Sequence, residues 1–185
     1  MTTFEVIANG MNAVSVVLAA RNSVHTWWTG IIGCVLFGIL FFGAQLYADV
    51  TLQVFFIVTC VFGWMQWTKG NEGAPVPIKR TGLRLLGLMA LSGVIVTVAY
   101  GSLLHVYTDA YAPFLDSTVL AFSVLGQLLL MQRRIETWWC WILVDIIAVP
   151  LFASRGLYVT SVLYAAFLGN AVFGLRRWKR EMSEA

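Results

Sequence analysis

Charged side chains are scarce in this sequence. Only 11% of its 185 residues are Asp, Glu, Lys or Arg, and 59% are hydrophobic, whereas a typical soluble domain carries about 25% charged residues. The mean hydropathy is +0.80. This composition excludes an ordinary soluble domain and predicts an integral membrane protein. Since a span needs about 20 apolar residues, the length allows at most about seven or eight transmembrane helices.

Motifs for metal binding and catalysis are also missing. Three Cys and two His are present, but Cys34, Cys60 and Cys140 lie inside apolar runs without a CxxC spacing, and His25 and His105 are far apart in the chain. This pattern argues against a metal site and against an intramembrane hydrolase. The absence of GxxxxGK[ST] argues against an ATP motor within the chain. We therefore expect no cofactor, no enzymatic activity and no nucleic-acid partner.

Apolar sequence dominates the chain and divides into seven segments. No alternation typical of strands appears, and helices satisfy their own backbone groups in lipid. We therefore predict an all-α integral membrane protein with seven transmembrane helices. The segments are about 4–20, 26–43, 47–67, 82–104, 114–131, 137–154 and 157–175.

Basic residues gather in every second connection between these segments. Only Arg155 lies on the other side, so the positive-inside rule predicts a cytoplasmic C-terminus and an outside N-terminus in a bacterial inner membrane. Residues 1–9 hold no basic stretch, so we expect no cleavable signal peptide. The basic residues on the predicted cytoplasmic side are Arg21, Lys69, Lys79, Arg80, Arg84, Arg133, Arg134, Arg176, Arg177, Lys179 and Arg180.

The sequence repeats itself at a spacing of 111 residues. Matches of Trp and Gly in fixed register are informative, because apolar matches are common in so hydrophobic a chain. They indicate a duplicated unit of three helices. The matching stretches are Thr26-Trp27-Trp28 with Thr137-Trp138-Trp139, Phe62-Gly63 with Phe173-Gly174, and Trp67 with Trp178.

One helix is left between the two copies, and this odd helix keeps both copies in the same orientation. The predicted fold is thus 3+1+3, with two parallel three-helix repeats related by a pseudo-two-fold axis along the membrane normal. In transporters of this plan the substrate binds between the repeats near the midplane. The predicted parts are a first repeat at 4–67, a cytoplasmic loop at 68–81, a linker helix at 82–104, a second repeat at 114–178 and a cytoplasmic tail at 179–185.

The sixth segment carries the most distinctive side chains. At 100° per residue, Trp138, Trp141 and Asp145 fall on one helix face, where two aromatic rings and a carboxylate could hold a flat cation. An Asp halfway along a span costs about 2.5–3.5 kcal/mol on an insertion scale. Intramembrane charges usually line a pathway. The alternative is a structural role, in which Asp145 bonds a neighbouring helix or stays protonated.

Other polar side chains within the spans suit a hydroxyl-rich ligand such as a ribose, although each could instead connect helices. The candidates are Asn12, Gln53, Gln127, Tyr158 and Tyr164.

All eight Trp lie near predicted cytoplasmic helix ends. We interpret Trp27, Trp28, Trp139 and Trp178 as an interfacial aromatic belt.

The motif Trp138-x-x-Trp141-x-x-x-Asp145, together with 36–42 and Trp67 in the first repeat, resembles the Pnu family of bacterial vitamin transporters. The resemblance covers nearly the whole chain. It implies a SWEET-like 3+1+3 fold, facilitated diffusion, and trapping of the substrate by a cytoplasmic kinase. The best-known branch takes up nicotinamide riboside and often has Asn where this chain has Asp145. Sister branches carry thiamine or riboflavin.

We therefore expect a transporter that takes up nicotinamide riboside, an aromatic nucleoside, across the lipid bilayer for NAD salvage. A carboxylate beside Trp rings favours a cation over a neutral flavin, but it does not separate nicotinamide riboside from thiamine. The alternative from a different class is a membrane sensor that binds the vitamin without moving it. The sequence leaves the oligomeric state and any coupling ion open.

Overall fold

The computed structural model describes residues 3–43, 47–69, 77–107, 111–154, 156 and 158–184. Within these residues the chain forms seven α-helices and no strand, which confirms the predicted all-α class. Arg155 and residues 70–76 of the predicted loop lie outside the described residues. The helices are α1 (Thr3–Ala20), α2 (His25–Gly43), α3 (Tyr47–Lys69), α4 (Leu83–Tyr107), α5 (Pro113–Met131), α6 (Thr137–Ser154) and α7 (Tyr158–Glu184).

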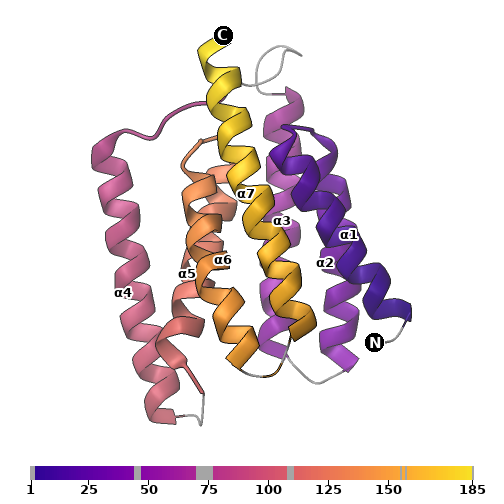
Figure 1. Cartoon of the computed structure of the whole chain (residues 1–185), viewed down its shortest axis with the longest axis vertical. Helices are drawn as coiled ribbons and strands as arrows, with labels where there is room; N and C mark the ends of the chain where they lie inside the picture. Colours follow the sequence, from indigo (N-terminus) through magenta and orange to yellow (C-terminus); the bar gives the residue numbers. More distant parts are fainter. Residues whose placement is uncertain are drawn as a thin grey trace.

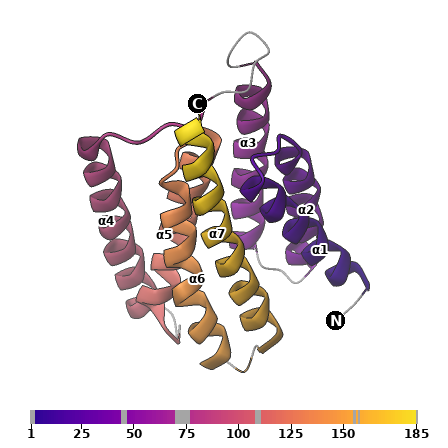
Figure 2. The ribbon, with the colours of Figure 1, turned by 45° about the horizontal axis from the view of Figure 1, so that its top comes forward.

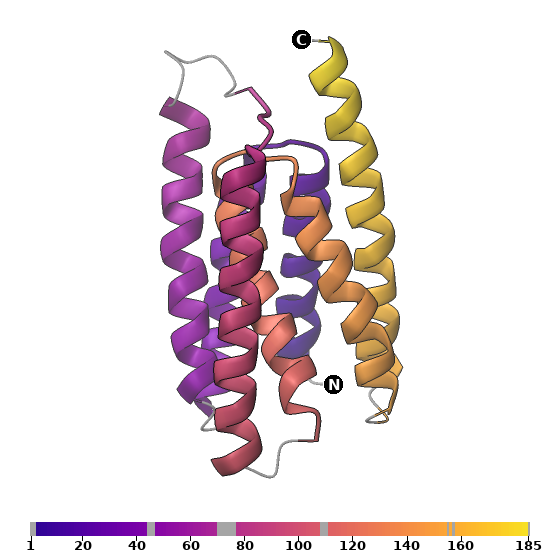
Figure 3. The same cartoon turned by 90° about the vertical axis from the view of Figure 1, so that its left-hand side faces the viewer.

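Six of the helices form a closed ring, and α4 lies outside it. Each helix of the first repeat packs on the next, as do those of the second repeat. The ring closes because α1 packs on α7 and α3 packs on α5. These two contacts are equivalent under the predicted pseudo-two-fold axis, which relates α1 to α5 and α3 to α7. Helix α4 packs on α5 at one edge of the molecule (Figures 1, 2 and 3).

The two repeats run in the same direction. Helices α1 and α5 both rise toward the end of the bundle where α7 finishes, and α2 and α6 both descend from it (Figure 1). We call this the basic end: it carries the α1–α2 connection, the α5–α6 connection and the C-terminal turns of α7. The parallel arrangement confirms the predicted 3+1+3 fold.

The surface of the bundle is apolar enough for a lipid environment. By length and hydropathy, three of the described helices could span a membrane by themselves, namely α4, α5 and α6. Two shorter apolar stretches, Val6–Ala20 and His25–Leu40, lie in α1 and α2. Along α4 only Gly93 and Gly101 are buried, so its apolar side chains point outward, as lipid contact requires.

The hydrogen bonds at the first corner of each repeat are the same. Thr26 Oγ1 donates to the carbonyl of Ser15 at 2.8 Å, and Thr137 Oγ1 donates to the carbonyl of Gly126 at 2.8 Å. These are equivalent positions 111 residues apart. Each bond fastens the start of one helix to the helix before it.

A cluster of four Trp forms the core near the basic end. Trp27, Trp67, Trp138 and Trp178 are at most 5% exposed, and we call them the Trp cluster. Within the repeats, Trp27 meets Trp67 edge-on at 5.1 Å and 86°, and Trp138 meets Trp178 at 5.4 Å and 89°. Trp67 and Trp178 then meet each other at 6.1 Å, which joins the two pairs. Such edge-to-face pairs contribute about 0.5–1.5 kcal/mol beyond their buried area.

This burial corrects the interpretation of the Trp residues as an interfacial belt. Trp27 and Trp178 are 1% and 0% exposed, so they belong to the core, where their rings pack on other rings. Trp28 and Trp139 are 38% and 57% exposed, as residues of a belt must be. The two Trp of each adjacent pair therefore have different roles, since consecutive side chains point about 100° apart around a helix.

Candidate functional site

Asp145 lies in the middle of α6 on its buried face. It is 3% exposed, and it makes no hydrogen bond or ion pair with the residues that the structure describes. Tyr164 of α7 interacts with it electrostatically. The Tyr164 ring itself packs on Phe152 at 5.0 Å and on Phe167 at 5.8 Å. Because burying a lone carboxylate is costly, the carboxylate of Asp145 is a candidate for binding a cation or a hydroxyl group from a ligand.

Trp141 lies one helical turn before Asp145. It is partly buried and packs against α5 at Gly126, where an added Cβ would approach its ring to 3.2 Å. The small residue therefore lets the indole lie between α5 and α6. Trp141 and Asp145 are close enough along the helix to contact one ligand, as the predicted shared face requires.

Trp138 has a different environment from Trp141. It is 2% exposed and is closed off by Trp178 and by Gly174 of α7, where a Cβ would come within 2.6 Å of its ring. Asp145 is seven residues further on, about 10 Å along the helix axis. In this conformation Trp138 thus packs the core, and the structure does not place it next to Asp145.

Gln127 connects the two repeats. It is 7% exposed, and its Nε2 donates to Thr59 Oγ1 at 3.4 Å and to Cys60 Sγ at 3.6 Å. These bonds join α5 to α3, so Gln127 has the helix-connecting role that was the alternative interpretation.

The remaining candidates are spread over both repeats. Asn12 of α1 packs against Gly33, where a Cβ would lie 2.8 Å from its Oδ1, and Gln53 of α3 packs beside Gly38 of α2. Tyr158 is 69% exposed at the start of α7. Trp141, Asp145 and Tyr164 thus lie on the adjacent helices α6 and α7 of the second repeat, whereas Asn12 and Gln53 lie on α1 and α3 of the first.

A set of contacts that we had not predicted joins the repeats at the basic end. Arg133 is 4% exposed, its guanidinium lies 4.2 Å from the Trp67 ring centroid, and its Nε donates to Asn22 Oδ1 at 2.9 Å. Asn22 Nδ2 donates to Glu181 Oε2 at 2.7 Å. Burial lowers the pKa of Arg133, and the Glu181 carboxylate raises it. We call Asn22, Trp67, Arg133 and Glu181 the inter-repeat latch.

The sequence held a signal for this latch. Asn22 and Arg133 occupy equivalent positions of the repeat, 111 residues apart. Both have a left-handed backbone, with φ of 56° and 55°, a conformation uncommon for residues other than Gly. Each follows the last turn of the first helix in its repeat. The pseudo-two-fold relation therefore brings the two connections face to face.

Comparison with known proteins identifies the family. The profile of the family described as nicotinamide mononucleotide transporter matches residues 2–180. The chain belongs to this family. The relatives and the solved structure that match this chain, described below, are named transporters rather than enzymes. This agrees with the absence of catalytic motifs. Together with its apolar helices, the family makes the chain a multi-pass bacterial membrane protein.

Two relatives and one solved structure are similar to this chain over most of its length. The nicotinamide riboside transporter PnuC of Escherichia coli K12 is 31% identical over 188 residues, with 87% of this chain and 78% of the relative covered. The riboflavin/roseoflavin transporter RibM of Streptomyces davaonensis is 25% identical, with coverages of 94% and 83%. A crystal structure of the vitamin B3 transporter PnuC has a TM-score of 0.74 at 23% identity, covering 96% of this chain and 81% of that one. This structure confirms the fold.

Proposed function

We propose that this protein takes up nicotinamide riboside by facilitated diffusion, as a step in NAD precursor salvage. The relative in E. coli bears the name of this activity, and the observation that carries the proposal is Asp145. A buried carboxylate that makes no hydrogen bond or ion pair among the described residues, one turn from an indole, suits the positively charged pyridinium ring of nicotinamide riboside. Neutral riboflavin offers no such charge.

The pyridinium ring and the ribose of nicotinamide riboside would contact different residues of the site. Trp141 would stack on the pyridinium while Asp145 compensates its charge, and Tyr164 lies on the adjacent helix for the ribose hydroxyls. Gln53 and Asn12 would supply further hydrogen bonds from the first repeat, whereas Gln127 would keep its helix-connecting role. Tyr158 would act at the entrance, since it is exposed at the start of α7.

Transport would occur by alternating access, with the two repeats rocking against each other around the site. The inter-repeat latch and the contact between Trp67 and Trp178 join the repeats at the basic end, so opening toward that side would separate them. In this motion Trp138 would leave its packed position. Its indole N–H has no hydrogen-bond partner among the described residues and would then be available to a ligand.

The positive-inside rule places the basic end in the cytoplasm, so the C-terminus would be cytoplasmic and the N-terminus outside. A cytoplasmic kinase would trap the nucleoside by phosphorylating it. This step would maintain inward flow through a transporter that has no energy source of its own.

Riboflavin uptake is the second candidate, because the RibM relative covers 94% of this chain. Thiamine, which also contains an aromatic cation, is the third ligand to compare. The lone carboxylate separates the candidates by charge: both cations should bind, and the flavin should bind weakly.

Uptake into proteoliposomes tests the proposal. The purified chain should admit radiolabelled nicotinamide riboside, and unlabelled nicotinamide riboside inside the vesicles should accelerate entry of the label. Thiamine, also a cation, should compete for binding, whereas neutral riboflavin should compete weakly. Binding to the detergent-solubilised protein without filling of vesicles would identify a sensor instead. Filling by riboflavin or thiamine alone would overturn the assignment of the substrate while leaving transport in place.

A further inference from the structure

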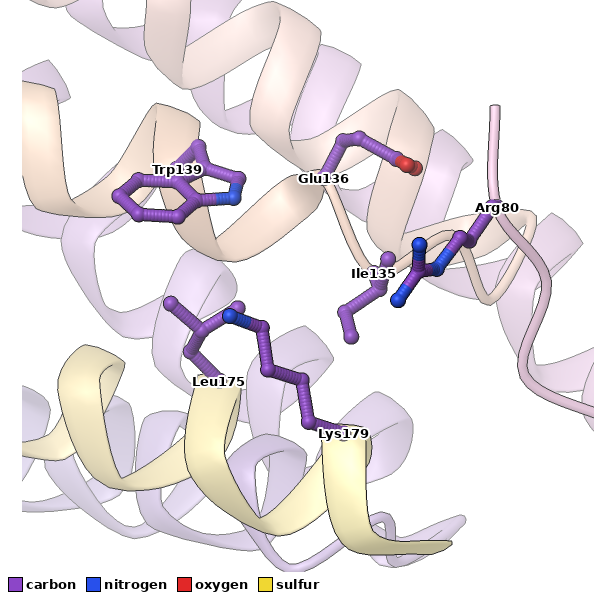
Figure 4. A pocket seen from close by; sticks show the side chains of 6 residues that line it. All are labelled: Arg80, Ile135, Glu136, Trp139, Leu175 and Lys179. Atoms are coloured by element: carbon purple, nitrogen blue, oxygen red, sulfur yellow. The ribbon is translucent and has the colours of Figure 1, made fainter. Parts of the chain in front are cut away.

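A second polar site lies at the basic end, between the start of α6, the last turns of α7 and the segment before α4. Its cavity of about 220 Å³ is separate from the surroundings of Asp145. The residues that line it are Arg80, Ile135, Glu136, Trp139, Leu175 and Lys179 (Figure 4).

The cavity has a net positive charge. Arg80 and Lys179 face Glu136 across it, and among the described residues neither cation forms an ion pair. On α7, Arg177 pairs with Glu181 at 2.8 Å and Arg180 with Glu184 at 3.6 Å. Arg80 and Lys179 are the two cations that line this cavity, and both remain available to an anion.

Glu136 is already held by hydrogen bonds from the protein. The backbone N–H of Thr81 donates to its Oε2 at 3.0 Å, and the Thr81 hydroxyl donates to the same atom at 2.7 Å. Because these donors partly satisfy the carboxylate, it competes less for the two cations. One negative charge against two positive ones leaves a site suited to a monoanion.

The backbone around Arg80 is fixed in place. The Lys79 N–H donates to the carbonyl of Arg133, and the Ile135 N–H donates to the carbonyl of Lys79, both at 3.0 Å. Arg134 Nη1 donates to the carbonyl of Arg80 at 3.3 Å. Arg80 thus extends from a segment that is anchored to the α5–α6 connection.

The cavity opens beside the outer, apolar surface of the bundle. Trp139 is 57% exposed in the first turn of α6, and Ile146, two turns further along the same face, is 54% exposed. Lys179 Nζ lies 5.8 Å from the Trp139 ring centroid. An exposed Trp beside a Lys at a helix end is typical of the headgroup level of a bilayer.

We propose that this cavity binds the phosphate group of an anionic phospholipid. Arg80 would bind the phosphate oxygens, because its guanidinium matches their geometry, and Lys179 would add a second charge. Trp139 would contact the glycerol backbone and the first acyl carbons. Basic pockets between transmembrane helices bind lipid headgroups in this way. A soluble phosphate ester shares the chemistry of the headgroup but would not use the lipid-facing Trp139.

Native mass spectrometry of the full chain tests this site with phosphatidylglycerol, phosphatidylcholine and inorganic phosphate as probes. Phosphatidylglycerol should give a retained adduct and raise the melting temperature, whereas phosphatidylcholine and phosphate should not. Arg80→Gln and Lys179→Gln should each weaken the adduct about fivefold, the size expected for one basic side chain at an anionic surface. Trp139→Leu should weaken it as well.

The matched control is Arg180→Gln, which removes the same charge from an exposed neighbour of Lys179. If Arg180→Gln weakens the adduct as much as Lys179→Gln does, the cavity is not the binding site and the proposal fails. Competition by inorganic phosphate at similar affinity would also overturn the assignment to a lipid. Circular dichroism of each variant shows that a weaker adduct does not result from unfolding.

Discussion

The two repeats share their packing and differ in their chemistry. In the first, Trp27 packs against Gly63, and in the second, Trp138 packs against Gly174, with a glycine-to-ring approach too close for a Cβ in both. The Trp pairs and the corner hydrogen bonds also match. Duplication has therefore preserved the contacts that hold each three-helix unit together.

Three of the differences between the repeats concern the candidate site and the inter-repeat latch. Where the second repeat has Trp141 and Asp145, the first has Gly30 and Cys34. Cys34 is buried like Asp145 but carries no charge at neutral pH. Where the second repeat has Arg133, the first has Asn22. The comparison indicates a common scaffold in which the second repeat supplies the charged groups for both the site and the latch.

Substitution of Gly63 or Gly174, the two glycines that pack against Trp rings, should disturb the shared scaffold most. Gly174→Ala would place a Cβ 2.6 Å from the Trp138 ring, and Gly63→Ala would place one 2.5 Å from the Trp27 ring. Neither ring can move freely inside the Trp cluster, so each change should destabilise the protein by about 1–3 kcal/mol. Thermal unfolding in detergent measures this loss, which should be similar in the two repeats.

Gly169→Ala is the matched control on α7, because a Cβ there meets no atom within 4 Å. It should leave stability unchanged or raise it slightly, since Ala favours a helix more than Gly does. If Gly174→Ala unfolds at the same temperature as Gly169→Ala, the packing of the Trp cluster is not the shared scaffold that we describe.

Removing the charge of the inter-repeat latch should cost about as much stability as disturbing the glycine packing. Arg133→Gln keeps much of the side-chain volume but removes the charged hydrogen bond to Asn22 and the contact with Trp67, so we expect a loss of about 1.5–3 kcal/mol. A double-mutant cycle of thermal unfolding that combines Arg133→Gln with Asn22→Ala should reveal a coupling energy between the two residues. Arg176→Gln, which removes the same charge from an exposed position of α7, is the control. Equal losses for Arg133→Gln and Arg176→Gln would show that the latch does not hold the repeats together.

The sequence predicts the scaffold better than the site because the two depend on different information. Hydropathy locates all seven helices, and the fixed register of Trp and Gly reveals the duplication. Helical periodicity places Trp138 and Asp145 on one face, but it does not say what lies opposite that face. The burial of Trp138 therefore required the structure, since it depends on Trp178 and Gly174 of another helix.

The latch shows a second limit. The sequence marks Arg133 only as a basic residue that orients the protein in the membrane. Its contact with Asn22 depends on two left-handed backbone conformations at residues other than Gly, and no turn signal marks them. Aligning the two repeats would have paired the residues, but their direct contact follows from the pseudo-two-fold arrangement of the folded chain.

We propose that the charge of Asp145 gives the second repeat a ligand-binding role that the first lacks. A Trp-fluorescence titration with nicotinamide riboside, comparing the wild type with Asp145→Asn and Cys34→Ser, tests it most directly. Asp145→Asn keeps the shape and removes the charge, so the affinity should fall at least about tenfold, whereas Cys34→Ser at the equivalent position should bind nearly as the wild type does. Unchanged affinity in Asp145→Asn, or an equal loss in Cys34→Ser, would contradict the account.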